Sequence, residues 1–202
     1  MKITKYAFAI LLGSAVFVSC GPSKSGEEAN DDDSTDVAEE STSTSAPEKV
    51  MMQAKAVINP ASDSKLNGEA TFTDLGEGLV TFKLTVNHAV PGEHAVHLHE
   101  KGDCSAADAK SAGGHWNPTD VKHGNRPVDM QFHAGDIDNM EVGEDSTGVL
   151  TMTITGWTIG GADSTNIVGK ALIIHGGADD FESQPSGAAG KRVACGVIEK
   201  VM

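Results

Sequence analysis

Histidines gather in one part of the chain, where their spacing suits a metal ion. The segment HAVHLHEKGDCSAADAKSAGGHWNP, residues 94–118, holds four of the eight histidines and one of the three cysteines. His97 and His99 are two residues apart, and on a β-strand such residues point to the same face of the sheet. Two imidazoles held side by side form half of a metal site, although a chance pair of surface histidines would have the same pattern.

Further side chains of ligand type follow, at the ends of expected strands and in a long loop. Imidazole and carboxylate groups are common ligands of transition metals. Together with His97 and His99, the candidate ligands are His115 and His123 in the loop, His133 and Asp136 in HAGD, and His175 at a strand end. The sequence therefore predicts a metal centre. His88 and His94 are interpreted as surface or strand-edge histidines without a role.

The elements that must position these side chains are predicted to be strands. Apolar and polar residues alternate in GLVTFKLTV (78–86) and GVLTMTIT (148–155), which is typical of half-buried strands. Further strands are expected at 52–58, 66–74, 94–99, 128–133, 168–175 and 192–199. Seven or eight short strands separated by turn residues favour an antiparallel sandwich or barrel. The stretch 100–127 lacks a strand pattern and is expected to be a functional loop.

The first 49 residues are expected to lie outside this domain. Residues 1–20 carry two lysines, an apolar run and Ser19-Cys20, which is typical of a secretory signal peptide. The Ser-Cys end resembles a bacterial lipobox, so Cys20 is predicted to be lipidated; an ordinary signal peptide with an incidental cysteine is the alternative. Residues 21–49 hold nine acids and almost nothing apolar, which predicts a disordered acidic tether. The folded domain is then 50–202.

Charge and cysteine usage narrow the function further. The chain has a formal net charge of −14, and residues 50–202 carry 20 acidic against 11 basic side chains, so nucleic acid is not an expected partner. If Cys20 is lipidated, Cys104 and Cys195 remain in an exported protein, where disulfides persist. A disulfide between them is expected, and two free buried thiols are the alternative.

Six segments, in order, resemble the signature of the copper/zinc superoxide dismutase family. They are HLHEKGDC, SAGGHWNP, KHG, HAGD, IIHGGADD and GKRVACGVI, and the resemblance covers residues 50–200. It implies an all-β fold, a Greek-key β-barrel or sandwich of about eight antiparallel strands with long functional loops. The short step from His99 to Cys104 is closer to the bacterial branch of the family.

The resemblance also implies a role for each matching residue. The copper ligands would be His97, His99, His115 and His175, and the zinc ligands His115, His123, His133 and Asp136, so that His115 bridges both ions. Asp179 would link a copper-side and a zinc-side histidine, Arg192 would attract and orient the anionic substrate, and Cys104 would pair with Cys195. Without the histidines, Arg192 would be an ordinary surface residue.

The implied activity is the conversion of two superoxide anions to dioxygen and hydrogen peroxide by Cu(II)/Cu(I) cycling, with one copper and one zinc per subunit and with His115 and Arg192 as catalytic residues. Lys191 is expected to add positive charge near the channel, and Lys170 is a possible further contributor. The alternatives are a lipoprotein that stores or buffers copper and zinc, and a purely structural β-sandwich. We further expect an exported protein of the periplasm or cell surface, attached to a membrane through its N-terminal lipid, and a possible homodimer.

Overall fold

The structure is a computed structural model, and it describes residues 51–201. The predicted signal peptide, Cys20 and the predicted tether 21–49 lie outside the described residues and stay predictions. Within the described range, no helix is long and apolar enough to cross a membrane. The regular structure consists of the strands β1 Gln53–Pro60, β2 Asn67–Gly76, β3 Leu79–Asn87, β4 Gly92–His99, β5 Asp136–Val142, β6 Gly148–Thr155, β7 Ala171–His175, β8 Arg192–Val197 and β9 Glu199–Val201, and of one 3-10 turn, η1 Lys110–Ala112.

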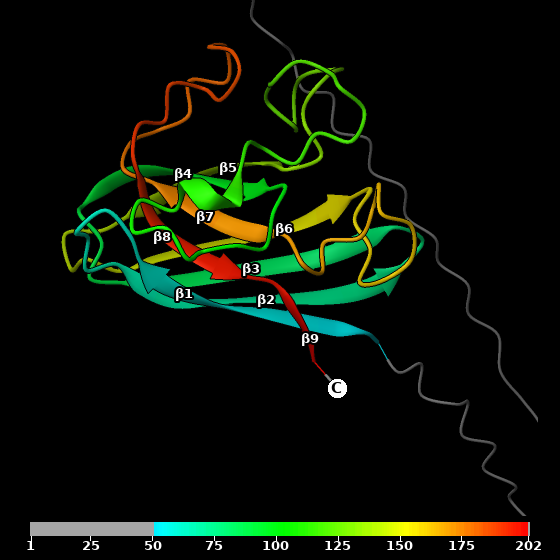
Figure 1. Cartoon of the computed structure of the whole chain (residues 1–202), viewed down its shortest axis with the longest axis horizontal. Coiled ribbons are helices and arrows are strands. Elements are labelled where there is room, and N and C mark those ends of the chain that lie inside the picture. The colour runs from blue at the N-terminus through cyan, green and yellow to red at the C-terminus, as the bar shows by residue number, and fades with distance from the viewer. Residues whose placement is uncertain (1–50, 202) are drawn as a thin grey trace, which may run out of the picture. The chain divides into compact units, whose positions relative to one another are not determined.

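The strands form one antiparallel barrel (Figure 1). Their order is β2-β3-β6-β5-β4-β7-β8-β1-β9, and an additional pairing of β1 with β2 closes the sheet on itself. Chain neighbours β3 and β4 are not neighbours in the sheet, because β6 and β5 lie between them, and this is a Greek-key connection. The predicted all-β barrel of about eight antiparallel strands is therefore confirmed, with β9 as a short addition beside β1.

Alternating apolar residues fill the barrel, as the sequence pattern predicted. On β3, Val80, Phe82, Leu84 and Val86 are completely buried. The ring of Phe82 stacks on that of Phe72 at 5.2 Å between centroids. Burying one such side chain stabilises a fold by about 1.5–3 kcal/mol, so this one strand contributes substantially to the stability of the scaffold.

The same alternation on β4 places the histidines outside the barrel. Val96 and Leu98 belong to the core, and successive side chains on a strand point to opposite faces. His97 and His99 therefore face away from the core, yet they are only 0% and 1% exposed. They are covered because the loops 100–135 and 176–191 lie over this side of the barrel (Figure 1).

One expected strand is wrong, and another was missed. Residues 128–133 form turns and irregular structure instead of a strand, and Val128 and Met130 are 76% and 100% exposed. The Asp129 carboxylate accepts a hydrogen bond from the Asn125 N–H, which stabilises a local turn. The strand is β5, whose sequence DIDNMEV alternates poorly, and its pairing with β4 contains a register shift at Val96/His97.

Candidate metal centre

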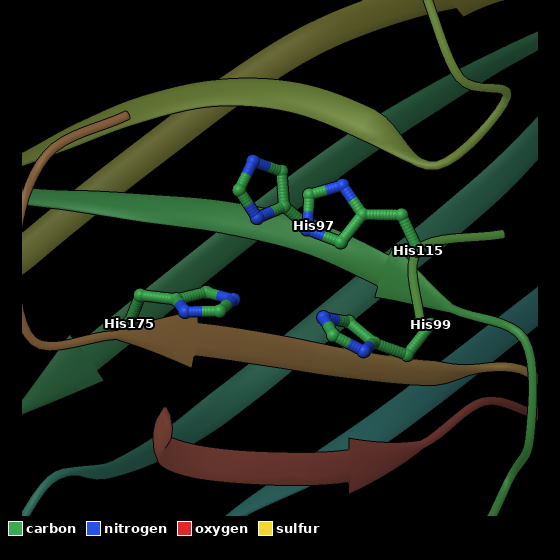
Figure 2. A group of neighbouring side chains, drawn as sticks. All are labelled: His97, His99, His115 and His175. Atoms are coloured by element: carbon green, nitrogen blue, oxygen red, sulfur yellow. The ribbon is translucent and has the colours of Figure 1, made fainter. Parts of the chain in front are cut away.

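Four histidines from three parts of the chain meet on the outer face of β4 and β7. Figure 2 shows the rings of His97, His99, His115 and His175 turned toward one another. His97 and His99 come from β4 and His175 from the end of β7, and these two strands pair in the sheet. His115 is brought in by an isolated antiparallel bridge between its backbone and that of His99. One ring nitrogen of each lies within 4.8 Å of the others.

The facing nitrogens of these four rings have no hydrogen-bond partner within the described residues. The atoms are His97 Nδ1, His99 Nε2, His115 Nε2 and His175 Nε2, and all are buried. The opposite nitrogen of each ring does have a partner, for example Gly113 O for His99 at 2.9 Å and Gly190 O for His175 at 3.3 Å. A buried polar atom without a partner costs about 1–3 kcal/mol, so four that converge on one point fit a ligand set for a cation.

A second group of buried side chains surrounds the carboxylate of Asp136. The Nδ1 atoms of His115, His123 and His133 lie 2.9, 3.0 and 3.3 Å from its Oδ1. Its other oxygen accepts the backbone N–H of Gly124 at 3.2 Å and that of His133 at 2.8 Å, which turns Oδ1 toward the rings. Three ring nitrogens and one carboxylate oxygen form a donor set that zinc accepts.

Asp179 connects the two groups. Its Oδ2 accepts a hydrogen bond from His97 Nε2 at 2.7 Å, and its Oδ1 accepts one from His123 Nε2 at 2.9 Å. Its backbone is fixed by Asn139 on β5, which accepts the Asp179 N–H at 2.7 Å and donates to the Asp179 carbonyl at 2.9 Å. The position predicted for Asp179 is therefore the one the structure gives it, and carboxylates placed in this way orient metal-binding histidines.

The protonation of the metal-free groups suits cation binding. Burial lowers the pKa of His99 to about 2, that of His175 to about 3 and that of His115 to about 4. These rings are therefore neutral near pH 7, and each keeps a lone pair for a ligand bond. Burial alone would raise the pKa of Asp136, but hydrogen bonds from the three surrounding histidines outweigh it and hold that pKa well below its usual range.

The pKa of His123 shifts in the direction opposite to those of His99, His115 and His175. Burial acts to lower its pKa, but the hydrogen bonds to Asp136 and Asp179 are together stronger and raise the pKa to about 9. Without an ion, a proton on His123 compensates the two nearby carboxylates. A bound dication would take over that compensation, and its binding would release the proton.

Arg192 lies beside the first group, as predicted. It begins β8, is half-buried, and donates hydrogen bonds from Nη1 to Ala109 O and from Nη2 to Gly113 O, both at 2.7 Å. Since Gly113 O also contacts His99 Nδ1, the guanidinium and that ring share one anchor. The predicted disulfide is present: Cys104 and Cys195 are bonded, with a Cα–Cα distance of 5.8 Å, and it ties the loop 100–135 to β8.

A cleft of about 680 Å³ opens onto these residues. Its lining residues include Arg192, His99, His115, His175 and Lys122. Neither of the other two lysines lines this cleft: Lys191 lines a different cavity, and the Lys170 ammonium lies 5.4 Å from the ring of Trp116, so their contribution of positive charge near the channel stays a prediction. A residue that is close to the site in the sequence need not line the cleft, because its side chain can point in another direction.

Arg126 is a site residue that sequence reasoning missed. Its guanidinium donates to the carbonyls of Asp136 at 2.7 Å and Ala134 at 2.6 Å, and more weakly to those of His133 and Thr155, both at 3.3 Å. Burial lowers its pKa to about 10, so it stays charged at neutral pH. Arg126 thereby links the backbone around His133 and Asp136, two of the candidate ligands, to the end of β6. No sequence pattern indicates which carbonyls a side chain will bind.

His94 was interpreted as a surface or strand-edge residue, and the structure contradicts the surface position. It is 4% exposed, with Nδ1 2.7 Å from His175 O and Nε2 2.7 Å from Val90 O. The ring thus links the chain that enters β4 to the backbone of His175. The sequence signal for a role of His94 was its closeness to His97, three residues further on. Residues three apart on a strand face opposite sides, however, so His94 was not expected to belong to the same ligand set.

Comparison with known proteins agrees with the geometry. The sequence pattern of copper/zinc superoxide dismutase (SODC) matches residues 66–198. The crystal structure of the clock protein EA4 is similar to this chain, with 34% sequence identity, a TM-score of 0.65, and coverage of 73% of this chain and 93% of that one. The chain belongs to the copper/zinc superoxide dismutase family.

Proposed function

We propose that the protein is an active superoxide dismutase that converts two superoxide anions and two protons into dioxygen and hydrogen peroxide. The observation that carries this proposal is the position of Arg192 in one cleft with His99, His115 and His175. A protein that only stores metal has no need of a fixed guanidinium beside its ligands, whereas an enzyme with an anionic substrate does.

The two ligand groups fit the two ions that the family implies. His97, His99, His115 and His175 would hold copper through four ring nitrogens, and His115, His123, His133 and Asp136 would hold zinc. Copper would supply one-electron redox chemistry at this place, and zinc would supply a fixed positive charge.

The chain's own residues bind the substrate and supply a proton. Arg192 and Lys122 outnumber the one carboxylate among the lining residues, Asp120, and make the cleft attractive to a small anion, although residues 50–202 carry more acidic than basic side chains. Local positive groups in a cleft can outweigh the net charge of a domain in this way. His115 belongs to both groups, and its Nε2 faces the first one, so this atom is placed to hold a proton and to donate it to the reduced product.

The test is the rate of superoxide removal by protein that has been stripped of metal and reloaded with copper and zinc. A rate above roughly 10⁸ M⁻¹s⁻¹ that requires copper would support the enzyme, since this is close to the diffusional ceiling. Arg192→Ile is expected to bind copper normally and to remove superoxide much more slowly. Tight copper binding with negligible turnover in the unaltered protein would favour storage or buffering instead.

We also propose that the protein is exported and lipid-anchored through Cys20. The disulfide between Cys104 and Cys195 supports export, because such bonds persist in oxidising compartments. Cys20→Ala is expected to move the protein from the membrane fraction to the soluble fraction of the cell envelope. Unchanged fractionation would contradict the anchor.

A further inference from the structure

The side chain of Gln184 makes two reciprocal hydrogen bonds with the backbone of a candidate zinc ligand. Gln184 lies in the loop 176–191, and its Oε1 accepts the N–H of His123 at 3.0 Å. Its Nε2 donates to the carbonyl of the same residue at 2.9 Å. The two residues are 61 positions apart in the sequence, so this pair of bonds joins two different loops.

Two hydrogen bonds of opposite direction restrict the orientation of the His123 backbone more than a single bond would. A single bond leaves the backbone of His123 free to rotate about the donor–acceptor line, whereas two bonds on its N–H and C=O define its orientation. Asn139 holds the backbone of Asp179 by the same arrangement. Asp179 and the His123 ring are joined by a hydrogen bond, and the backbone of each of these two residues is held by its own carboxamide side chain.

The loop 176–191 therefore holds His123 at two places. Asp179 binds its ring at Nε2, and Gln184 binds its backbone. The ring nitrogen that remains, Nδ1, is buried and lies 3.0 Å from Asp136 Oδ1. Its position depends on all of these contacts, because the segment that carries His123 belongs to no strand.

We propose that Gln184 is a positioning residue that retains zinc by fixing the backbone of His123. This inference relies on the ligand set of the proposed function and adds to it a role for the loop 176–191, which closes over the zinc half of the centre as a clamp. Loss of a residue that orients a metal ligand weakens binding by about 10–100-fold. We expect zinc to leave about 10–100-fold faster when both bonds of Gln184 are removed.

The experiment compares zinc release from the full chain loaded with copper and zinc, into an excess of a coloured chelator. Gln184→Leu removes both bonds. Gln184→Glu keeps an acceptor for the His123 N–H but sets a carboxylate oxygen against the His123 carbonyl, so zinc release is expected to be faster than in the unaltered protein. Gln131→Leu is the matched control, because Gln131 lines the same cleft but its side chain makes no hydrogen bond among residues 51–201.

Two further measurements separate zinc retention from a merely structural contact. Hydrogen exchange of the His123 amide in the metal-free protein reports whether the bonds exist, and it is expected to be faster in Gln184→Leu. The visible and electron paramagnetic resonance spectra of Cu(II) report the copper ligands, and they are expected to be unchanged. Since Gln184 is exposed, its replacement leaves the core intact.

Faster zinc release in Gln184→Leu, with the control at the wild-type rate, supports the proposal. Faster amide exchange with unchanged zinc release overturns it and leaves the enzyme proposal intact. An unaltered protein that fails to retain zinc at all overturns this inference together with the proposed zinc ligands, whereas the enzyme proposal is decided by the copper-dependent rate of superoxide removal, so the two failures are distinguishable.

Discussion

Replacing Asp179 with Asn changes the tautomer of a metal ligand without changing the shape of the site. A carboxylate can only accept hydrogen bonds, so His97 Nε2, at 2.7 Å from Asp179 Oδ2, carries the proton. The lone pair is then on Nδ1, the atom that faces the other three rings. Asp179 Oδ1 accepts two further bonds, from His123 Nε2 at 2.9 Å and from the N–H of Phe181 at 2.7 Å.

An Asn side chain at this position has one acceptor oxygen and one donor nitrogen. If the oxygen replaces Oδ1, the bonds from His123 and Phe181 remain, and only the bond from His97 is lost; the opposite orientation loses two bonds. The amide nitrogen therefore faces His97 Nε2, which favours the tautomer with the proton on Nδ1. That proton blocks the lone pair needed for copper.

The loss can be estimated from the single bond involved. A hydrogen bond to a charged group contributes about 1.5–3 kcal/mol, and 1.4 kcal/mol corresponds to a factor of ten. Copper affinity of the Asp179→Asn variant is therefore expected to fall by about 10–100-fold, which matches the usual effect of such groups on metal sites. Competition with a chelator of known affinity measures it.

Asp180→Asn is the matched control for this experiment. Asp180 is the next residue and also a carboxylate, but its hydrogen bonds stay within its own turn, to Glu182 and Ser183. The copper affinity of the Asp180→Asn variant is expected to equal that of the unaltered protein. If Asp179→Asn binds copper as tightly as Asp180→Asn does, the tautomer argument is wrong.

Three further predictions follow from the structure. Arg126→Lys keeps the positive charge but loses the several N–H donors of the guanidinium. We expect the free energy of unfolding to fall by about 2 kcal/mol, which lowers the Tm by about 4–8 °C for a domain of this size. An unchanged calorimetric Tm would contradict the role of Arg126 in fixing the backbone. Burial lowers the pKa of His99 to about 2 and that of His175 to about 3, so between these values and pH 6.5 the unfolded chain binds more protons than the folded one. The free energy of unfolding of the metal-free protein should therefore fall as the pH falls from 6.5 to 4. Urea titrations at several pH values measure it. Cys195→Ser opens a disulfide that spans 91 residues and should cost roughly 4–5 kcal/mol, measurable as a lower urea midpoint, whereas a reduced wild-type protein with an unchanged midpoint would refute this estimate.

The sequence determined the features that depend on local pattern or on residue type. Alternation placed Phe82 and its neighbours on β3 inside the barrel, and the two-residue spacing of His97 and His99 placed both outside it. All seven predicted metal-binding side chains come together in two overlapping groups, because their chemistry is visible in their types and order. The pairing of Cys104 with Cys195 was also accessible, given the prediction that Cys20 is lipidated and leaves two cysteines for a disulfide.

The tertiary structure decided what depends on backbone groups and on loops. It placed residues 128–133 in a loop and made β5 the strand, because pairing with β4 outweighs the poorer alternation of that segment. It brought Arg126 and Gln184 to the backbone of the ligands, and Lys122 in place of Lys191 to the cleft. Every residue carries an N–H or a carbonyl that a distant side chain can bind, so the sequence alone does not mark which of them are used.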